Sequence, residues 1–207
     1  MTIAIERVHP KFGARITGLD LRHPLDDVTF KAIDEAFNEY SVLVFPGQPL
    51  TDAQQIEFSR RFGALEETIS SIANKPNLDR KIADLSNVDA DGHVIDPADK
   101  RMVYHSANQM WHTDSSFKRV PALASMLSGR ECPPEGGETE FASMRVAYER
   151  LPESTRRSLE GKIAVHSFAY SRGLGRTSIF VASHASHIVG MPCSIADVRG
   201  MERSTAA

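Results

Sequence analysis

The stretch Val42-Leu43-Val44-Phe45-Pro46-Gly47 decides the fold class, because it is a compact apolar run that ends in a strong turn signal. Four consecutive apolar residues rich in β-branched and aromatic side chains are typical of a buried strand. The Pro-Gly pair then ends the strand. We therefore expect a buried strand at residues 42–45.

Helical patterns lie on both sides of this strand. Apolar residues recur at helical spacing from Asp27 to Tyr40. Beyond the strand, Thr51 is placed as the N-cap of a second helix that continues through Phe58 and that Gly63 ends. The helices are thus gathered early in the chain.

The remaining patterns are mostly those of short strands separated by turns. We expect strands near residues 3–5, 14–16, 82–85 and 163–170, a further helix over 147–159, and a turn at 133–137. Many strands with early helices predict an α+β, mainly β protein. Its core is expected to be an antiparallel sandwich of the jelly-roll (double-stranded β-helix) type, with flanking helices.

Composition limits the function classes. The chain has 207 residues, a formal net charge of −3 and a pI near 6.2. This balance predicts no nucleic-acid partner, and no apolar run is long enough to span a membrane. The N-terminus lacks a signal-peptide pattern, so we expect a cytoplasmic protein. Cys132 and Cys193 form no C-x-x-C pair, and we expect two free thiols.

Trp111-His112-Thr113-Asp114 carries the strongest chemical signal. In a strand, residues i and i+2 point to the same face, so His112 and Asp114 could reach one ion together. One neutral nitrogen and one carboxylate suit a metal such as Fe(II), and a distant histidine would complete a 2-His-1-carboxylate site. By itself the tripeptide has a common alternative, a loop histidine hydrogen-bonded to a nearby carboxylate.

Five ordered blocks surround this motif and make the pattern more specific. They are Val42-Leu43-Val44-Phe45 with the turn to Leu50; residues 54–66, which include Arg61-Phe62-Gly63-Ala64-Leu65-Glu66; residues 108–117; Pro133-Pro134-Glu135-Gly136-Gly137-Glu138-Thr139-Glu140-Phe141; and Met144-Arg145-Val146-Ala147-Tyr148. In this order they resemble the Fe(II)/2-oxoglutarate-dependent taurine dioxygenase family. The chain is most similar to the branch that opens phenoxyacetate herbicides such as 2,4-dichlorophenoxyacetate, from about Phe12 to Arg203.

The resemblance implies a jelly-roll oxidoreductase with Fe(II) as metal and 2-oxoglutarate as co-substrate. It makes His112 and Asp114 iron ligands and catalytic residues. It places Thr139 beside the far carboxylate of 2-oxoglutarate, together with Arg199 and its neighbour Arg203. An arginine suits that role because its planar fork can hold a carboxylate through two hydrogen bonds. Two surface arginines on an amphipathic strand are the alternative.

The resemblance specifies the substrate less directly than it specifies the metal and the co-substrate. Where taurine enzymes carry a His and a Tyr, this chain has Thr68 and Ser71, which argues against a taurine-like sulfonate. We assign Asn108, Ser71 and His184 to substrate binding. The expected reaction is hydroxylation of an aryloxyalkanoate next to its ether oxygen, followed by ether cleavage, with succinate and CO2 as the other products. The expected partners are this small carboxylate and O2, and relatives of this family commonly form homo-oligomers.

Two segments of the family pattern are missing. One gap lies near Leu174/Gly175, and a larger one near Pro192/Cys193 removes the block with the distal iron-binding histidine. Residues 1–207 would otherwise form a single catalytic jelly-roll domain. We expect that the protein contains these residues and that the numbering passes over them. A real deletion would take two core strands and expose sheet edges.

Two other function classes stay open. A zinc hydrolase would need three protein ligands and a water, and nothing beyond His112 and Asp114 supplies them. A non-catalytic jelly-roll binding module would retain the fold without the distal ligand. Metal content and dependence on 2-oxoglutarate separate these two classes from a dioxygenase. A dioxygenase of another small acid or sulfonate is a further alternative.

Overall fold

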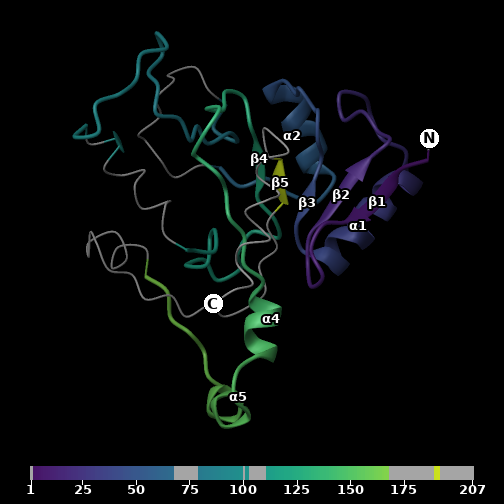
Figure 1. Cartoon of the computed structure of the whole chain (residues 1–207), viewed down its shortest axis with the longest axis vertical. Coiled ribbons are helices and arrows are strands. Elements are labelled where there is room, and N and C mark those ends of the chain that lie inside the picture. Colours follow the sequence, from purple (N-terminus) through teal and green to yellow (C-terminus); the bar gives the residue numbers. More distant parts are fainter. Residues whose placement is uncertain (1, 68–78, 100, 103–110, 168–188, 192–207) are drawn as a thin grey trace. The chain divides into compact units, whose positions relative to one another are not determined.

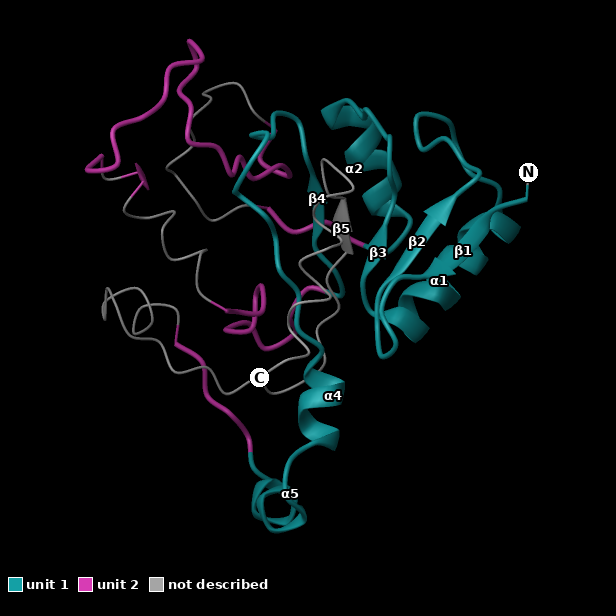
Figure 2. Ribbon diagram, viewed as in Figure 1, with its two compact units in different colours: residues 1–63, 123–162, 184–207 teal, residues 64–122, 163–183 magenta. Residues whose placement is uncertain are grey.

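The computed structural model describes residues 2–67, 79–99, 101–102 and 111–167, and the backbone of 189–191. The chain forms two compact units (Figures 1 and 2). Unit 1 contains residues 1–63, 123–162 and 184–207, and unit 2 contains residues 64–122 and 163–183. The elements that the sequence predicted most clearly lie in unit 1.

A three-stranded sheet opens unit 1. Strands β1 (Ala4–Arg7) and β2 (Ala14–Thr17) are antiparallel, and β2 runs parallel to β3 (Leu43–Val44). The strand expected at residues 42–45 is therefore confirmed, as are the two strands at the N-terminus. Gly18 allows the chain to turn close to its own start, since a Cβ there would lie 2.7 Å from the carbonyl oxygen of Thr2.

Both predicted helices are present and have side-chain caps. Helix α1 (Asp27–Tyr40) begins at the N-cap Asp26, whose carboxylate accepts a hydrogen bond from the amide of Thr29 at 2.7 Å. Helix α2 (Asp52–Arg60) begins at Thr51, the expected N-cap. Thr51 and Gln54 form a reciprocal capping box. The sequence located these helix starts because the signal is local.

The core of unit 1 lies between α1, α2 and this sheet. Its members are buried apolar side chains from all of these elements: Ala14, Ile16, Leu21, Ile33, Ala36, Phe37, Leu43, Phe45, Leu50 and Phe58. Aromatic rings pack edge to face inside it, and Phe58 meets both Phe45 and Phe62 in this way. This packing fixes α2 and, with it, the start of the segment that enters unit 2.

The later part of unit 1 departs from the expectations. Strand β4 (Met126–Ser128) pairs in parallel with β5 (Val189–Met191). The single helix expected over 147–159 is wrong. Two short helices, α4 (Met144–Glu149) and α5 (Glu153–Leu159), occupy this region, with Pro152 between them. Proline disfavours helical geometry at the preceding residue and lacks an amide donor, so one helix cannot continue through it.

The described residues of unit 2 are largely irregular. A bridge between Val88 and Val94 is its one described β-contact, and Ile95 is its one buried apolar residue in that described part. The strand expected at 82–85 is wrong, because a turn closed by the Ile82 amide and the Asp79 carbonyl precedes an irregular segment. Residues 163–167 are also irregular, and the rest of the strand expected at 163–170 lies outside the described residues.

The described residues thus contain both helices and sheets, which confirms the α+β class. Their pairing is antiparallel in one case and parallel in two, so an antiparallel, mainly β sandwich is not what these residues show. The jelly-roll core stays a prediction. None of the helices described has the length and apolar character that a membrane span requires.

Candidate active site

The side chains of His112 and Asp114 lie side by side in unit 2. Both interpretations of the motif allow this arrangement, either as two ligands of one ion or as a loop histidine hydrogen-bonded to a nearby carboxylate. The Nε2 atom of His112 lies 3.2 Å from Oδ1 of Asp114. Both side chains are partly open to solvent, with 36% and 48% of their surfaces exposed. Residues 111–113 are irregular and 114–117 form a turn, so the two groups converge without the strand that we expected.

This pair fits two corners of an iron site. A neutral imidazole nitrogen and a carboxylate oxygen are the donor types of the 2-His-1-carboxylate arrangement, and both point to one place. Partial exposure leaves room for further ligands on the open side. Two protein ligands do not complete the arrangement, and a third must come from elsewhere.

The turn that follows Asp114 is held by a charged network. Ser115 has a backbone φ of 55°, and its hydroxyl donates to Oε2 of Glu66 at 2.8 Å. The ammonium of Lys118 lies 2.7 Å from the same Glu66 oxygen. At the other side of the turn, Ser116 Oγ and His166 Nδ1 are 2.7 Å apart. The segment directly after the His112–Asp114 motif is therefore tied to two other parts of unit 2.

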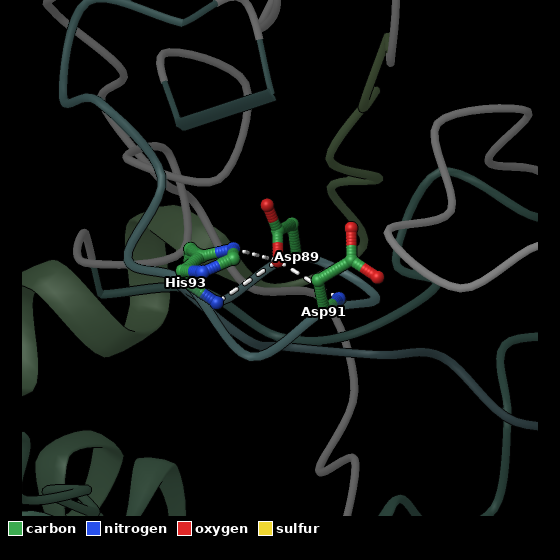
Figure 3. A group of neighbouring side chains, drawn as sticks. All are labelled: Asp89, Asp91 and His93. Atoms are coloured by element: carbon green, nitrogen blue, oxygen red, sulfur yellow. Dashed lines mark hydrogen bonds and ion pairs between the residues drawn. The ribbon is translucent and has the colours of Figure 1, made fainter.

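A second group of metal-type donors lies in the hairpin turn of unit 2. Asp89, Asp91 and His93 each offer one ligand atom, all within 4.8 Å of one another (Figure 3). Within the described part of the chain this is the one group of three such residues with this spacing. By donor chemistry alone it competes with His112 and Asp114 as the place of a metal ion.

Hydrogen bonding in the turn favours a structural role for Asp89. Its Oδ1 atom accepts from the backbone amides of Asp91 and His93, both at 2.9 Å. The bond from His93, with the smaller contribution from Asp91, lowers the pKa of the Asp89 carboxyl against the opposing effect of desolvation. The Asp89 amide also donates to the His93 carbonyl oxygen. These bonds close a tight turn without any ion.

Comparison with known families identifies the enzyme class, and the choice between the two groups of donors stays a prediction. Residues 4–192 match the family described as "Taurine catabolism dioxygenase TauD, TfdA family". The chain belongs to the taurine dioxygenase family. Because its members are non-haem iron dioxygenases that consume 2-oxoglutarate, the predicted enzyme class, metal and co-substrate are confirmed at the level of the family.

Individual relatives of this dioxygenase chain include enzymes of the same class. It is 37% identical to the alpha-ketoglutarate-dependent 2,4-dichlorophenoxyacetate dioxygenase of Cupriavidus pinatubonensis, over 93% of this chain and 77% of that protein. It is 38% identical to the (S)-phenoxypropionate/alpha-ketoglutarate-dioxygenase of Delftia acidovorans, over 83% and 56% of the respective chains. The crystal structure of AAD-2 with Mn(II) and N-oxalylglycine superposes with a TM-score of 0.72 at 37% identity, over 87% of this chain and 61% of AAD-2.

The structure describes three of the predicted site residues of this dioxygenase. His112 and Asp114 come together, whereas Thr139 lies in unit 1, exposed on an irregular segment. The other predicted site residues, Ser71, Asn108, His184, Arg199 and Arg203, lie outside the described residues. Their roles stay predictions, as does that of Thr139.

Three residues near the motif were missed as parts of the site. Glu66 and Lys118 close the turn after Asp114, and His166 bonds to Ser116. Glu66 already stood in one of the five family blocks, which was the available signal. The expectation of two free thiols is wrong, because Cys132 is disulfide-bonded. That expectation rested on a presumed compartment and on separation along the chain, neither of which determines distance in space.

Proposed function

We propose that this chain, as a 2-oxoglutarate-dependent iron dioxygenase, acts on a small aryloxyalkanoic acid. The observation that carries the proposal is the 37% identity with a 2,4-dichlorophenoxyacetate dioxygenase over 93% of the chain, together with a convergent His112–Asp114 pair at the family's motif. The (S)-phenoxypropionate enzyme supports the same substrate class, since phenoxypropionate is also an aryloxyalkanoate.

The proposed reaction is oxidation of the carbon between the ether oxygen and the carboxylate. One oxygen atom of O2 enters that C–H bond as a hydroxyl, and the other enters succinate as 2-oxoglutarate loses CO2. The hydroxylated carbon is then a hemiacetal. It breaks its bond to the ether oxygen, giving a phenol and, from a phenoxyacetate, glyoxylate. Hydroxylation and ether cleavage therefore share one oxidative step.

His112 and Asp114 are the residues that would hold the metal. His112 contributes a neutral nitrogen and Asp114 a negative oxygen, which leaves the remaining coordination positions to a third ligand and to the reactants. When bound, Fe(II) supplies the redox chemistry that the protein side chains lack. The chain's own contribution is to orient the two donors and the substrates. AAD-2, which superposes on this chain, was crystallised with Mn(II) and N-oxalylglycine, a compound with the carboxylate spacing of 2-oxoglutarate.

We further propose that Thr139 and Arg199 bind the far carboxylate of 2-oxoglutarate, with Arg203 beside them. A hydroxyl and a guanidinium can both donate to a carboxylate, and arginine stays charged at any working pH. Asn108, Ser71 and His184 are assigned to the substrate. The exposed position of Thr139 on an irregular segment after Gly136 and Gly137 leaves its hydroxyl open to a ligand.

The single jelly-roll domain with two missing segments also remains our proposal. The match to the 2,4-dichlorophenoxyacetate enzyme runs over 222 positions but includes 93% of 207 residues, about 193, so about 29 positions fall in gaps of this chain. The family match ends at residue 192, where we placed the larger gap. An intact mass of 22.8 kDa for the purified protein would mean that the distal histidine is deleted. The chain would then be a non-catalytic jelly-roll binding module and not an enzyme.

Product analysis tests the proposed substrate class. Purified chain is incubated with Fe(II), ascorbate, 2-oxoglutarate and one of four acids: 2,4-dichlorophenoxyacetate, phenoxypropionate, taurine or an alkyl sulfate. We expect a phenol and an equal amount of succinate with the first two. Succinate formation that depends only on taurine or the sulfate would overturn the substrate, and keto-acid-independent hydrolysis would overturn the enzyme class.

A further inference from the structure

The backbone of Ser115 adopts an unusual conformation directly after the proposed metal ligand Asp114. Its φ of 55° lies in the left-handed region, which residues with a side chain occupy uncommonly. Such a conformation persists where surrounding contacts hold it, and it often occurs at functional sites. The contacts of Ser115 therefore indicate what keeps the chain in this shape.

Glu66 supplies those contacts. One of its carboxylate oxygens, Oε2, accepts the hydroxyl of Ser115 at 2.8 Å and pairs with the ammonium of Lys118 at 2.7 Å. The amide of Lys118 in turn donates to the carbonyl oxygen of Ser115 at 2.9 Å, which closes the turn. A single oxygen thus holds the first and the last residue of the turn 115–118. About two thirds of the Glu66 and Lys118 side chains is covered, so water screens this contact only in part.

We propose that Glu66 is a positioning residue for the metal site. By holding Ser115 in its left-handed conformation it fixes the direction in which the chain leaves Asp114, and so keeps the Asp114 carboxylate beside the His112 imidazole. Glu66 makes no contact with the metal or the substrate in this proposal. The inference rests on the proposed function, because it takes His112 and Asp114 as the metal ligands.

The competing explanation is an ordinary surface ion pair between Glu66 and Lys118. A Ser115→Gly variant distinguishes the positioning role of Glu66 from a plain ion pair. Glycine adopts positive φ without strain, so it needs no contact to hold it in this conformation. If Glu66 acts through the conformation of Ser115, its removal should matter with serine at 115 and hardly at all with glycine. A plain ion pair would contribute equally in both backgrounds.

The experiment is a double-mutant cycle on the full chain, with Mn(II) alone as the probe. Mn(II) affinity is measured by electron paramagnetic resonance for the parent, Glu66→Ala, Ser115→Gly and the double variant. Because the left-handed conformation is unfavourable for a residue with a side chain, we expect Glu66→Ala to weaken Mn(II) binding about tenfold when Ser115 is present. In the Ser115→Gly background the same change should be below about twofold. Glu57→Ala, which removes the exposed partner of Arg60, is the matched control and should leave the affinity unchanged.

Hydrogen exchange gives a second reading that needs no metal. The Lys118 amide, which closes the turn, should exchange faster in Glu66→Ala than in the parent, and Ser115→Gly should suppress this difference. Equal effects of Glu66→Ala in both backgrounds, or none in either, would overturn the proposal. If the parent bound no Mn(II), the ligand assignment of the proposed function would fail, and the exchange result alone would decide whether Glu66 positions the turn.

Discussion

Phe58 is a buried aromatic side chain in the core of unit 1, and its removal should destabilise the protein. It is 6% exposed, and its ring centroid lies 5.8 Å from that of Phe45 and 5.6 Å from that of Phe62, both at near-perpendicular angles. Truncation to alanine loses the transfer free energy of the ring, leaves a cavity and ends two edge-to-face contacts. Buried phenylalanine-to-alanine changes cost about 3–5 kcal/mol, a figure that already includes such contacts, so we expect a value near 4 kcal/mol for Phe58→Ala.

Urea denaturation followed by circular dichroism measures this difference in the free energy of unfolding. Val28→Ala is the matched control, because Val28 lies in the first turn of α1 in the same unit with 81% of its surface exposed, and its truncation should change stability by less than about 0.5 kcal/mol. A loss below about 1 kcal/mol for Phe58→Ala would refute the placement of Phe58 in the core, since no close-packed site absorbs the loss of a ring so cheaply.

Further predictions concern a cap, a turn and a carboxylate. Thr51→Ala removes the N-cap oxygen of α2 and should lower the free energy of unfolding by about 1 kcal/mol, as measured by denaturation. Gly18→Ala should lower the thermal midpoint, because the new Cβ would meet a carbonyl oxygen at 2.7 Å in a left-handed conformation; an unchanged midpoint would contradict this geometry. Hydrogen bonds from Arg22 lower the pKa of Asp20 from 3.8 to about 2, so the stabilisation is present above pH 3.8 and is lost as the pH falls through about 2. Arg22→Ala removes the guanidinium but keeps the backbone amide, so an NMR titration of this variant should show that pKa raised towards 3.8, and an unchanged low value would rule out the Arg22 side chain as its main cause.

Local signals explain what the sequence could predict of the fold. Helix α1 has the expected bounds, because the capping side chain and the apolar spacing both lie within the segment itself. The break at Pro152 was also visible locally, and the expectation of one helix there gave the apolar pattern too much weight over the proline. Strand β4 pairs with residues more than sixty positions away, a contact for which the sequence alone offers no local rule.

The candidate site likewise combines a feature that the local sequence predicted with a long-range contact that it did not. The pairing of His112 with Asp114 followed from their spacing, although a turn rather than a strand brings them together. The role of Glu66 did not follow, because Ser115 is 49 residues away and its left-handed conformation has no sequence signature at a serine. For Asp89, Asp91 and His93, the geometry by itself suggests a metal site. Their donor atoms lie close together, but the hydrogen bonds that Asp89 accepts serve the turn itself.

The most direct test of the account is to compare Asp114→Ala with Asp91→Ala in 2,4-dichlorophenoxyacetate-dependent succinate formation from 2-oxoglutarate. The two changes remove one carboxylate each from the two groups of donors in the same unit. We predict that Asp114→Ala reduces succinate formation to the substrate-independent background, whereas Asp91→Ala retains the parent rate. Turnover that survives Asp114→Ala, or that Asp91→Ala abolishes, would contradict the assignment of His112 and Asp114 as the iron ligands.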